Sequence, residues 1–220
     1  MIPTSTLLRA VRLANTVLFL AAVGVLFDHS VTPAMARLTI DPHWASGRRG
    51  LVTVVDKTQD PAWHAANRRA VESWNRAAAG TGLRLTWTAG SGACAPVSGR
   101  IVVCGASADD LDDDAPLPRQ GVARLALGPD RNHPHLDSVV VLECADCGLG
   151  PARRRVVAAH ELGHALGLPH RGRPESVMYH VGGPDGPAAL DVGELGSVYR
   201  HVDAGDRCGY FDARIGPLCF

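Results

Sequence analysis

A chain of 220 residues with 46% hydrophobic residues is long enough to bury the core of one domain but short for two. It carries 22 basic and 22 acidic side chains, so its formal net charge is zero. A nucleic-acid partner favours a basic surface, and this balance argues against one. We therefore expect a single globular domain that does not bind nucleic acid.

The first 36 residues have the pattern of a secretory signal peptide. Two arginines precede an apolar run over residues 13–27, and small residues ending at Ala36 form an A-x-A cleavage site. A membrane-spanning helix usually needs about 20 apolar residues, so this run is short for an anchor. We predict a signal peptide over residues 1–36 and a secreted domain over residues 37–220. The alternative is an uncleaved N-terminal membrane anchor.

Six cysteines follow this segment, and an even number in an exported chain indicates disulfide bonds. They fall into pairs close in sequence, and we predict the bonds Cys94–Cys104, Cys144–Cys147 and Cys208–Cys219. Cys144 and Cys147 also form a C-x-x-C motif, which could be redox-active or half of a zinc site. No second C-x-x-C and no βαβ pattern accompanies the motif, so a disulfide is the preferred interpretation.

The most regular helix pattern lies between the first two predicted strands. Alternating β-branched residues predict the first strand over residues 51–55. Asp60 can then cap a helix, Pro61 suits its first position and Gly80 can end it. Its apolar side chains recur at three- and four-residue steps, so we expect this stripe in the core. The stripe consists of Trp63, Ala66, Ala70, Trp74 and Ala77.

The rest of the chain adds four strands and a second helix. We expect the strands over residues 83–88, 100–104, 121–128 and 137–143, and the helix over residues 151–167. This order predicts an α+β fold in which both helices pack against a mixed sheet. The acidic residues between Asp109 and Asp114 could ligate Ca²⁺, but they lack the D-x-D-x-D-G pattern, so a solvated loop is preferred.

The stretch HELGHALGLPH begins at His160 and has the spacing of a catalytic zinc site. His160 and His164 lie four residues apart on a helix, so both side chains can bind one Zn²⁺. Gly167 permits a sharp turn that brings His170 back as a third ligand. Glu161 lies beside the ligands and can take a proton from a metal-bound water. Three protein ligands leave one position open, as in catalytic rather than structural zinc sites.

On this motif and the following ESVMY, the chain resembles the metzincin zinc endopeptidases, and the matrixins in particular. The resemblance implies a twisted five-stranded mixed sheet with two packed helices, a zinc-site helix, a methionine turn and a short C-terminal helical subdomain. It makes Met178 the floor beneath the three imidazoles and Asp191 the residue that braces the methionine turn. It makes the strand at 121–128 the edge of the cleft and residues 190–199 the C-terminal helix.

The chain also departs from the matrixin pattern. It has no P-R-C-G cysteine switch, and His180 stands where matrixins often have proline. No H-x-D structural-zinc signature appears in the loop after the third predicted strand. His133, His135 and Asp137 lie together, but a surface loop is preferred there over a second metal site. A small secreted bacterial relative fits best, similar also to the snapalysins, which have aspartate in place of His170.

These features predict a secreted zinc-dependent endopeptidase with one catalytic Zn²⁺. Glu161 would activate a zinc-bound water, and a protein or peptide substrate would bind extended in the cleft as an added strand. We expect a monomer. The alternatives are a secreted zinc-binding module without turnover and a zinc hydrolase of a non-protein amide.

Overall fold

The computed structural model describes residues 42–45, 52–111, 119–129 and 135–200, together with the backbone of two short strands near the C-terminus. The chain divides into two units, Met1–Thr39 and Ile40–Phe220, and every described residue lies in the second. The predicted signal peptide and the predicted Cys208–Cys219 bond lie outside the described residues. Among the described residues, no helix is long and apolar enough to cross a membrane.

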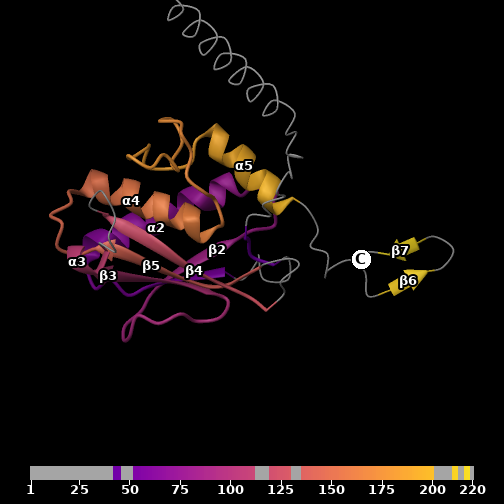
Figure 1. Ribbon diagram of the computed structural model, residues 1–220, viewed down its shortest axis with the longest axis horizontal. Helices are drawn as coiled ribbons and strands as arrows, with labels where there is room; N and C mark the ends of the chain where they lie inside the picture. Colours follow the sequence, from indigo (N-terminus) through magenta and orange to yellow (C-terminus); the bar gives the residue numbers. More distant parts are fainter. Residues whose placement is uncertain are drawn as a thin grey trace, which may run out of the picture. The chain divides into compact units, whose positions relative to one another are not determined.

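Five strands form one mixed sheet in the order β2-β1-β3-β5-β4 (Figure 1). The first four in this order are parallel, whereas β4 pairs antiparallel with β5 and forms one edge. The strand order confirms the mixed five-stranded sheet expected from the sequence. The strands are β1 (Val52–Asp56), β2 (Leu85–Ala89), β3 (Arg100–Ala106), β4 (Gly121–Leu127) and β5 (Leu136–Cys144).

Two long helices, α2 (Pro61–Ala77) and α4 (Pro151–Ala165), pack together on one face of the sheet (Figure 1). Each begins with proline at its first position, where the missing N–H costs no helical hydrogen bond. The side chain of Asp60 accepts a hydrogen bond of 2.7 Å from the N–H of Ala62, which confirms Asp60 as the cap of α2. A third helix, α5 (Ala189–Tyr199), follows the segment beyond α4.

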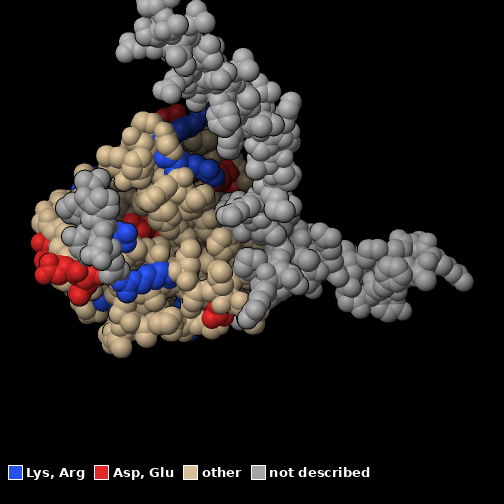
Figure 2. All heavy atoms as spheres, in the orientation of Figure 1, with Lys and Arg blue, Asp and Glu red and all other residues tan. Residues whose placement is uncertain are grey.

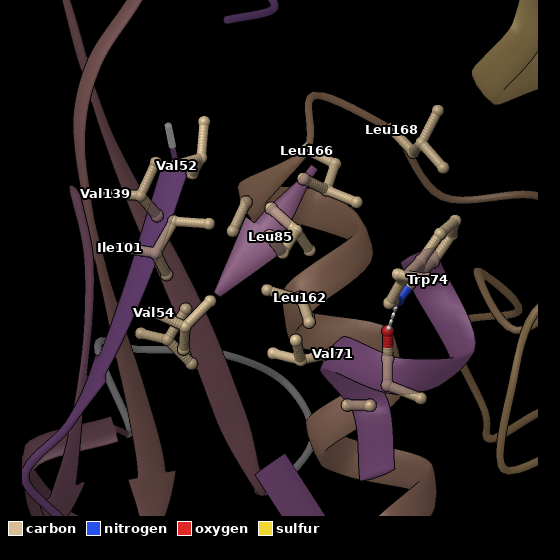
Figure 3. Packing of buried hydrophobic residues seen from close by; sticks show 14 of the residues in the cluster. Val52, Val54, Val71, Trp74, Leu85, Ile101, Val139, Leu162, Leu166 and Leu168 are labelled. Atoms are coloured by element: carbon tan, nitrogen blue, oxygen red, sulfur yellow. Dashed lines mark hydrogen bonds between the residues drawn. The ribbon is translucent and has the colours of Figure 1, made fainter. Parts of the chain in front are cut away.

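The core lies between these two helices and the sheet. Figure 3 shows Val54 and Ile101 of the sheet facing Val71 of α2 and Leu162 of α4. Trp63 and Trp74 are fully buried, which confirms the prediction that the tryptophans of α2 belong to the core. The indole N–H of Trp74 donates a hydrogen bond of 2.8 Å to the carbonyl of Ala159, so α2 fixes α4 one residue before His160 (Figure 3).

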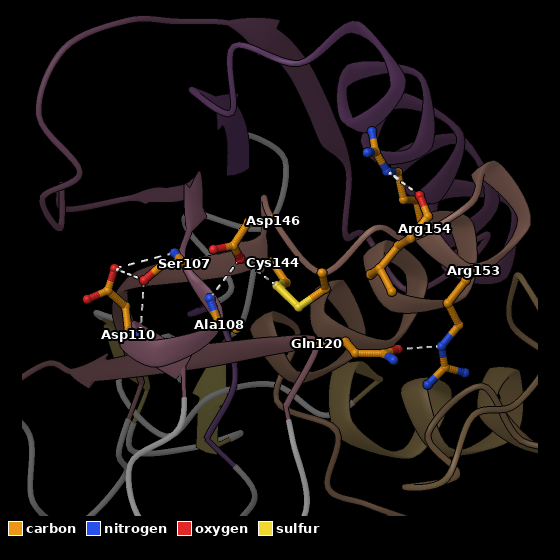
Figure 4. Close-up of a disulfide and its surroundings, with 10 residues drawn as sticks. Ser107, Ala108, Asp110, Gln120, Cys144, Asp146, Arg153 and Arg154 are labelled. Carbon is orange, nitrogen blue, oxygen red and sulfur yellow. Dashed lines mark hydrogen bonds between the residues drawn. A yellow bond between two sulfur atoms is a disulfide. The ribbon is translucent and has the colours of Figure 1, made fainter.

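Two of the predicted disulfides are present, Cys94–Cys104 and Cys144–Cys147. The first ties the loop after β2 to β3, and the second closes the turn after β5 (Figure 4). Cys144 and Cys147 are therefore joined to each other, as the preferred interpretation of the C-x-x-C motif expects.

The structure adds elements that the sequence did not predict. The acidic segment predicted as a loop contains a short helix, α3 (Ala108–Leu111). Its acidic side chains give the acidic patch visible over α3 in Figure 2, on a face where basic side chains form separate groups. Near the C-terminus, β6 (Tyr210–Asp212) and β7 (Gly216–Leu218) pair antiparallel.

Candidate metal centre and active site

His160 and His164 lie on the last two turns of α4, with ring centroids 4.7 Å apart. The helix ends at Ala165 with Leu166 as its C-cap, and Gly167 adopts a φ of +92°, a backbone conformation that L side chains rarely adopt. A Cβ at Gly167 would also collide with the carbonyl oxygen of Pro42. Gly167 therefore reverses the chain, and the His170 ring lies 5.2 Å from that of His160 and 4.7 Å from that of His164.

Backbone carbonyls fix the tautomers of the two helical histidines. Nδ1 of His160 lies 2.7 Å from the carbonyl of Val177, and Nδ1 of His164 lies 2.7 Å from the carbonyl of Leu168. A carbonyl can only accept, so each Nδ1 carries the hydrogen and each Nε2 carries a lone pair. Carbonyl partners of this kind orient histidines that bind metals through Nε2.

The three imidazoles favour their neutral form. Burial and, after it, the nearby His160 lower the pKa of His164 to about 4. Burial also lowers the pKa of His160 and, together with the neighbouring His180, that of His170. A neutral imidazole is the form that binds a metal ion, so the cluster does not have to lose protons at neutral pH before it binds one.

The spacing of the nitrogens fits a single ion. One nitrogen from each ring forms a group whose atoms all lie within 4.8 Å of one another. Nε2 of His170 lies 3.2 Å from Nε2 of His160. Tetrahedral Zn²⁺, with bonds of about 2.0–2.1 Å to imidazole, holds its ligand nitrogens roughly 3.3 Å apart. The described residues thus include three neutral nitrogen donors with a separation suited to zinc.

The methionine turn, which carries Met178, packs against α4. Met178 is fully buried, and its sulfur lies so close to Gly163 that a Cβ there would collide with it. The carboxylate of Asp191 in α5 accepts hydrogen bonds from the Ser176 hydroxyl and from the N–H of Val177, the latter at 3.1 Å. These bonds confirm that Asp191 braces the turn. They also fix Val177, whose carbonyl orients His160.

Glu161 lies against the edge strand β4. Its side chain is 6% exposed and accepts a hydrogen bond from the N–H of Ala123. A Cβ at Gly121 would come within 2.7 Å of Glu161 Cγ, so only glycine leaves room for this carboxylate. Burial raises the pKa of Glu161 to about 8, against the lowering effects of Arg119 and the Ala123 N–H. A divalent cation nearby would favour the ionised form.

Residues 105–191 match the family model described as Matrixin. Over this segment the chain is similar to the matrixins. The matched segment runs from the end of β3 to Asp191, and so contains β4, the three histidines and the methionine turn. The family implies a zinc metallopeptidase. None of the curated proteins compared with the chain matches it.

Other residues considered as metal ligands form hydrogen bonds or ring contacts with neighbouring side chains. Asp110 accepts a hydrogen bond of 2.6 Å from the Ser107 hydroxyl at the start of α3, and residues 112–114 lie outside the described residues. Asp137 accepts one of 2.7 Å from Ser98, and the His135 ring packs edge-on against His43. The calcium site stays a prediction.

Sequence reasoning missed several polar residues beside this centre. The side-chain amide of Asn67 donates hydrogen bonds to the carboxylates of Asp56 and Glu143, each at 3.0 Å. This buried cluster lies near the C-terminal ends of β1 and β5. Arg153 donates a hydrogen bond to Gln120, the residue directly before β4, and lies against Gly182, which follows the methionine turn. The only local signal was a polar residue within an apolar pattern, as Glu143 is in SVVVLEC.

Proposed function

We propose that the chain is a secreted zinc endopeptidase in which His160, His164 and His170 hold one catalytic Zn²⁺. The observation that carries the proposal is the convergence of three neutral imidazoles, two of them oriented through Nδ1 by backbone carbonyls. Three protein ligands leave room for water or substrate, which distinguishes this set from a closed structural site. The matrixin match supports the same reading.

Zinc supplies a Lewis acid that polarises the scissile carbonyl and lowers the pKa of water toward about 7. Glu161 is the general base in this proposal. Its carboxylate takes a proton from the attacking water and later gives that proton to the leaving amine nitrogen. The Ala123 N–H and the bare Cα of Gly121 hold the carboxylate in one orientation.

The edge strand β4 is the proposed binding surface for an extended substrate. It pairs with β5 on one side, and its residues from Arg124 to Leu127 are exposed. A peptide can add to such an edge as a further strand through backbone hydrogen bonds. Because Glu161 contacts β4 at Gly121 and Ala123, a peptide on this edge would pass beside the proposed base.

Zinc content and proteolysis measured on the same preparation test the proposal. We expect about one Zn²⁺ per chain, cleavage of casein or a quenched fluorescent peptide, loss of both with a chelator and recovery on adding Zn²⁺. His170→Ala should weaken zinc binding by more than the roughly 10–100-fold typical of losing an outer-shell partner. The exposed neighbour His180 gives the matched control, since His180→Ala removes an imidazole outside the converging group.

Two outcomes would contradict the proposal in different ways. A His170→Ala protein with full zinc and full activity would exclude the three-histidine site. A wild-type protein that holds zinc but cleaves no protein or peptide in a broad library would favour the zinc-binding module without turnover. Cleavage of small amides without cleavage of peptides would favour the hydrolase of a non-protein amide.

A further inference from the structure

We propose that Arg153 makes this site selective for substrates that carry a carboxylate close to the scissile bond. The inference rests on the proposed peptidase function and names the substrate class that the site prefers. It comes from the position of one guanidinium group relative to the histidines, and from the partners that this group has in the described part of the chain.

Arg153 lies on the histidine side of α4. It precedes His160 by seven residues, which is two helical turns, so both side chains leave the same face of the helix. With a rise of 1.5 Å per residue, Arg153 lies about 10 Å before His160 along the helix axis, on the side of α4 that carries the metal-binding group.

Two further segments meet at the Arg153 side chain. Its Nε–H donates a hydrogen bond to the side-chain oxygen of Gln120, the residue directly before β4 (Figure 4). A Cβ on Gly182, which follows the methionine turn, would collide with the terminal nitrogen Nη1. The guanidinium group thus lies where α4, the start of the edge strand and the segment after the methionine turn come together.

The neighbouring arginines differ from Arg153 in their partners. Arg154 donates to the carboxylate of Asp60 at 2.6 Å, and Arg155 donates to that of Asp185 at 2.8 Å. Within the described ranges, Arg153 instead hydrogen-bonds a neutral amide through one of its five N–H groups. In Figure 4 the Arg153 side chain extends away from its helix, and its guanidinium lies beside the end of the Gln120 side chain.

A partly buried guanidinium of this kind is suited to a substrate carboxylate. The side chain is half-buried, and charges attract more strongly there than in bulk water. The planar fork of arginine can bind both oxygens of a carboxylate at once. Arg119, two residues before β4, adds a second cation at that end of the edge strand.

Matched peptides that carry Glu, Gln or Lys at each position around the cleaved bond test this proposal. At one position, kcat/KM for the wild type should favour Glu by roughly 10- to 100-fold, the strength expected of a charge-assisted hydrogen bond. Arg153→Gln should remove that preference, and Arg153→Glu should turn it toward Lys. Arg155→Gln should keep it, because that arginine already pairs with Asp185.

A binding measurement separates a preference in substrate binding from an effect on the rate of cleavage. The same peptides would be titrated by fluorescence anisotropy against the zinc-loaded Glu161→Gln protein, with and without Arg153→Gln. The preference for Glu should appear in these dissociation constants too. Peptides ending in a free carboxylate or in an amide would show whether the favoured carboxylate belongs to a side chain or to the chain end. Melting temperature and zinc content would establish that each variant is folded.

The proposal is overturned if the wild type cleaves peptides without any preference for a carboxylate, or if Arg153→Gln retains the preference. If the wild type cleaves no peptide at all, the proposed peptidase function fails instead. Anisotropy would then still show whether Arg153 binds carboxylates.

Discussion

Glu143 is a carboxyl group in the protein interior, near the end of β5. It is fully buried, Asn67 donates to its Oε2, and its Oε1 has no hydrogen-bond partner among the described residues. Burial raises the pKa of Glu143 well above its usual range; the Asn67 hydrogen bond opposes this, and the charges of Asp56 and Glu161 add to it. Glu143 therefore favours the neutral form in the folded protein.

This shift predicts how stability depends on pH. Above the unfolded pKa of about 4.3, Glu143 keeps its proton in the folded state and loses it in the unfolded state. The free energy of unfolding should therefore fall as the pH rises from that value to the folded pKa. The contribution of this group is at most about 1.4 kcal/mol per pH unit. Glu143→Gln keeps a neutral side chain that can accept from Asn67, and should lack this component.

Chemical denaturation from pH 5 to pH 9 measures the effect. The stability of Glu143→Gln relative to wild type should rise across this range, whereas the exposed control Glu72→Gln should follow the wild type. Parallel curves for wild type and Glu143→Gln would show that Glu143 does not titrate differently in the folded state.

At the scale of elements, the methionine turn depends on α5. Asp191 is fully buried and accepts hydrogen bonds from Ser176, from the Val177 N–H and from the Ala188 N–H, the last at 2.8 Å. One carboxylate thus joins the start of α5 to the turn that carries Met178. The same contact reaches the metal-binding group, because the Val177 carbonyl orients His160.

Asp191→Ala should destabilise the protein by about 3 kcal/mol, because it leaves buried donors without an acceptor. Zinc affinity should fall by roughly 10–100-fold, the usual effect of losing an outer-shell support. Asp185→Ala is the matched control. Asp185 is a partly exposed partner of Arg155, so its loss should cost less than about 1 kcal/mol. Denaturation and zinc titration would be compared, and equal effects of the two substitutions would disprove the bracing role of Asp191.

The elements differ in how far local sequence determines them. The helices α2 and α4 were predicted within a few residues, since proline, the apolar stripe and glycine mark their ends locally. The strands were predicted from local runs of β-branched and alternating residues, and their observed ends are shifted by one or two residues. The helix α3 was missed because its single turn is stabilised by Ser107 within an acidic run. The strands β6 and β7 are three residues long, too short for a periodic pattern.

The candidate site was predictable where its residues share one motif. The three histidines and Glu161 lie within eleven residues of sequence, so helix geometry brings the first two histidines together and Gly167 returns the third. The supports of Glu161 come from β4, and Asn67 joins β1 to β5 from α2. These contacts depend on how separate elements pack, which no local pattern reports.

At the scale of the whole molecule, the cysteines and the N-terminal segment lead to one prediction about export. An exported chain should lose residues 1–36 and begin at Arg37, and Cys208 should be joined to Cys219 as the other four cysteines are joined in sequence-local pairs. N-terminal sequencing and non-reducing peptide mapping of secreted protein would check both. A retained N-terminus would favour the membrane anchor, and free thiols at both positions would contradict the third pair.

The central claim is that Glu161 is the base of a zinc peptidase, and Glu161→Gln tests it most directly. Glutamine has the same shape, fits the space left by Gly121 and can accept from the Ala123 N–H, but it cannot take up a proton. Zinc content should therefore stay near the wild-type value. Peptide hydrolysis should fall by about 10²–10⁴-fold, mainly in kcat, because the missing interaction belongs to the transition state.

Both proteins would be assayed on one quenched fluorescent peptide, with zinc measured in the same samples and Glu72→Gln as the surface control. The account predicts normal zinc in all three proteins and a large loss of kcat in Glu161→Gln alone. A Glu161→Gln protein with normal zinc and activity within a few-fold of wild type would contradict the account.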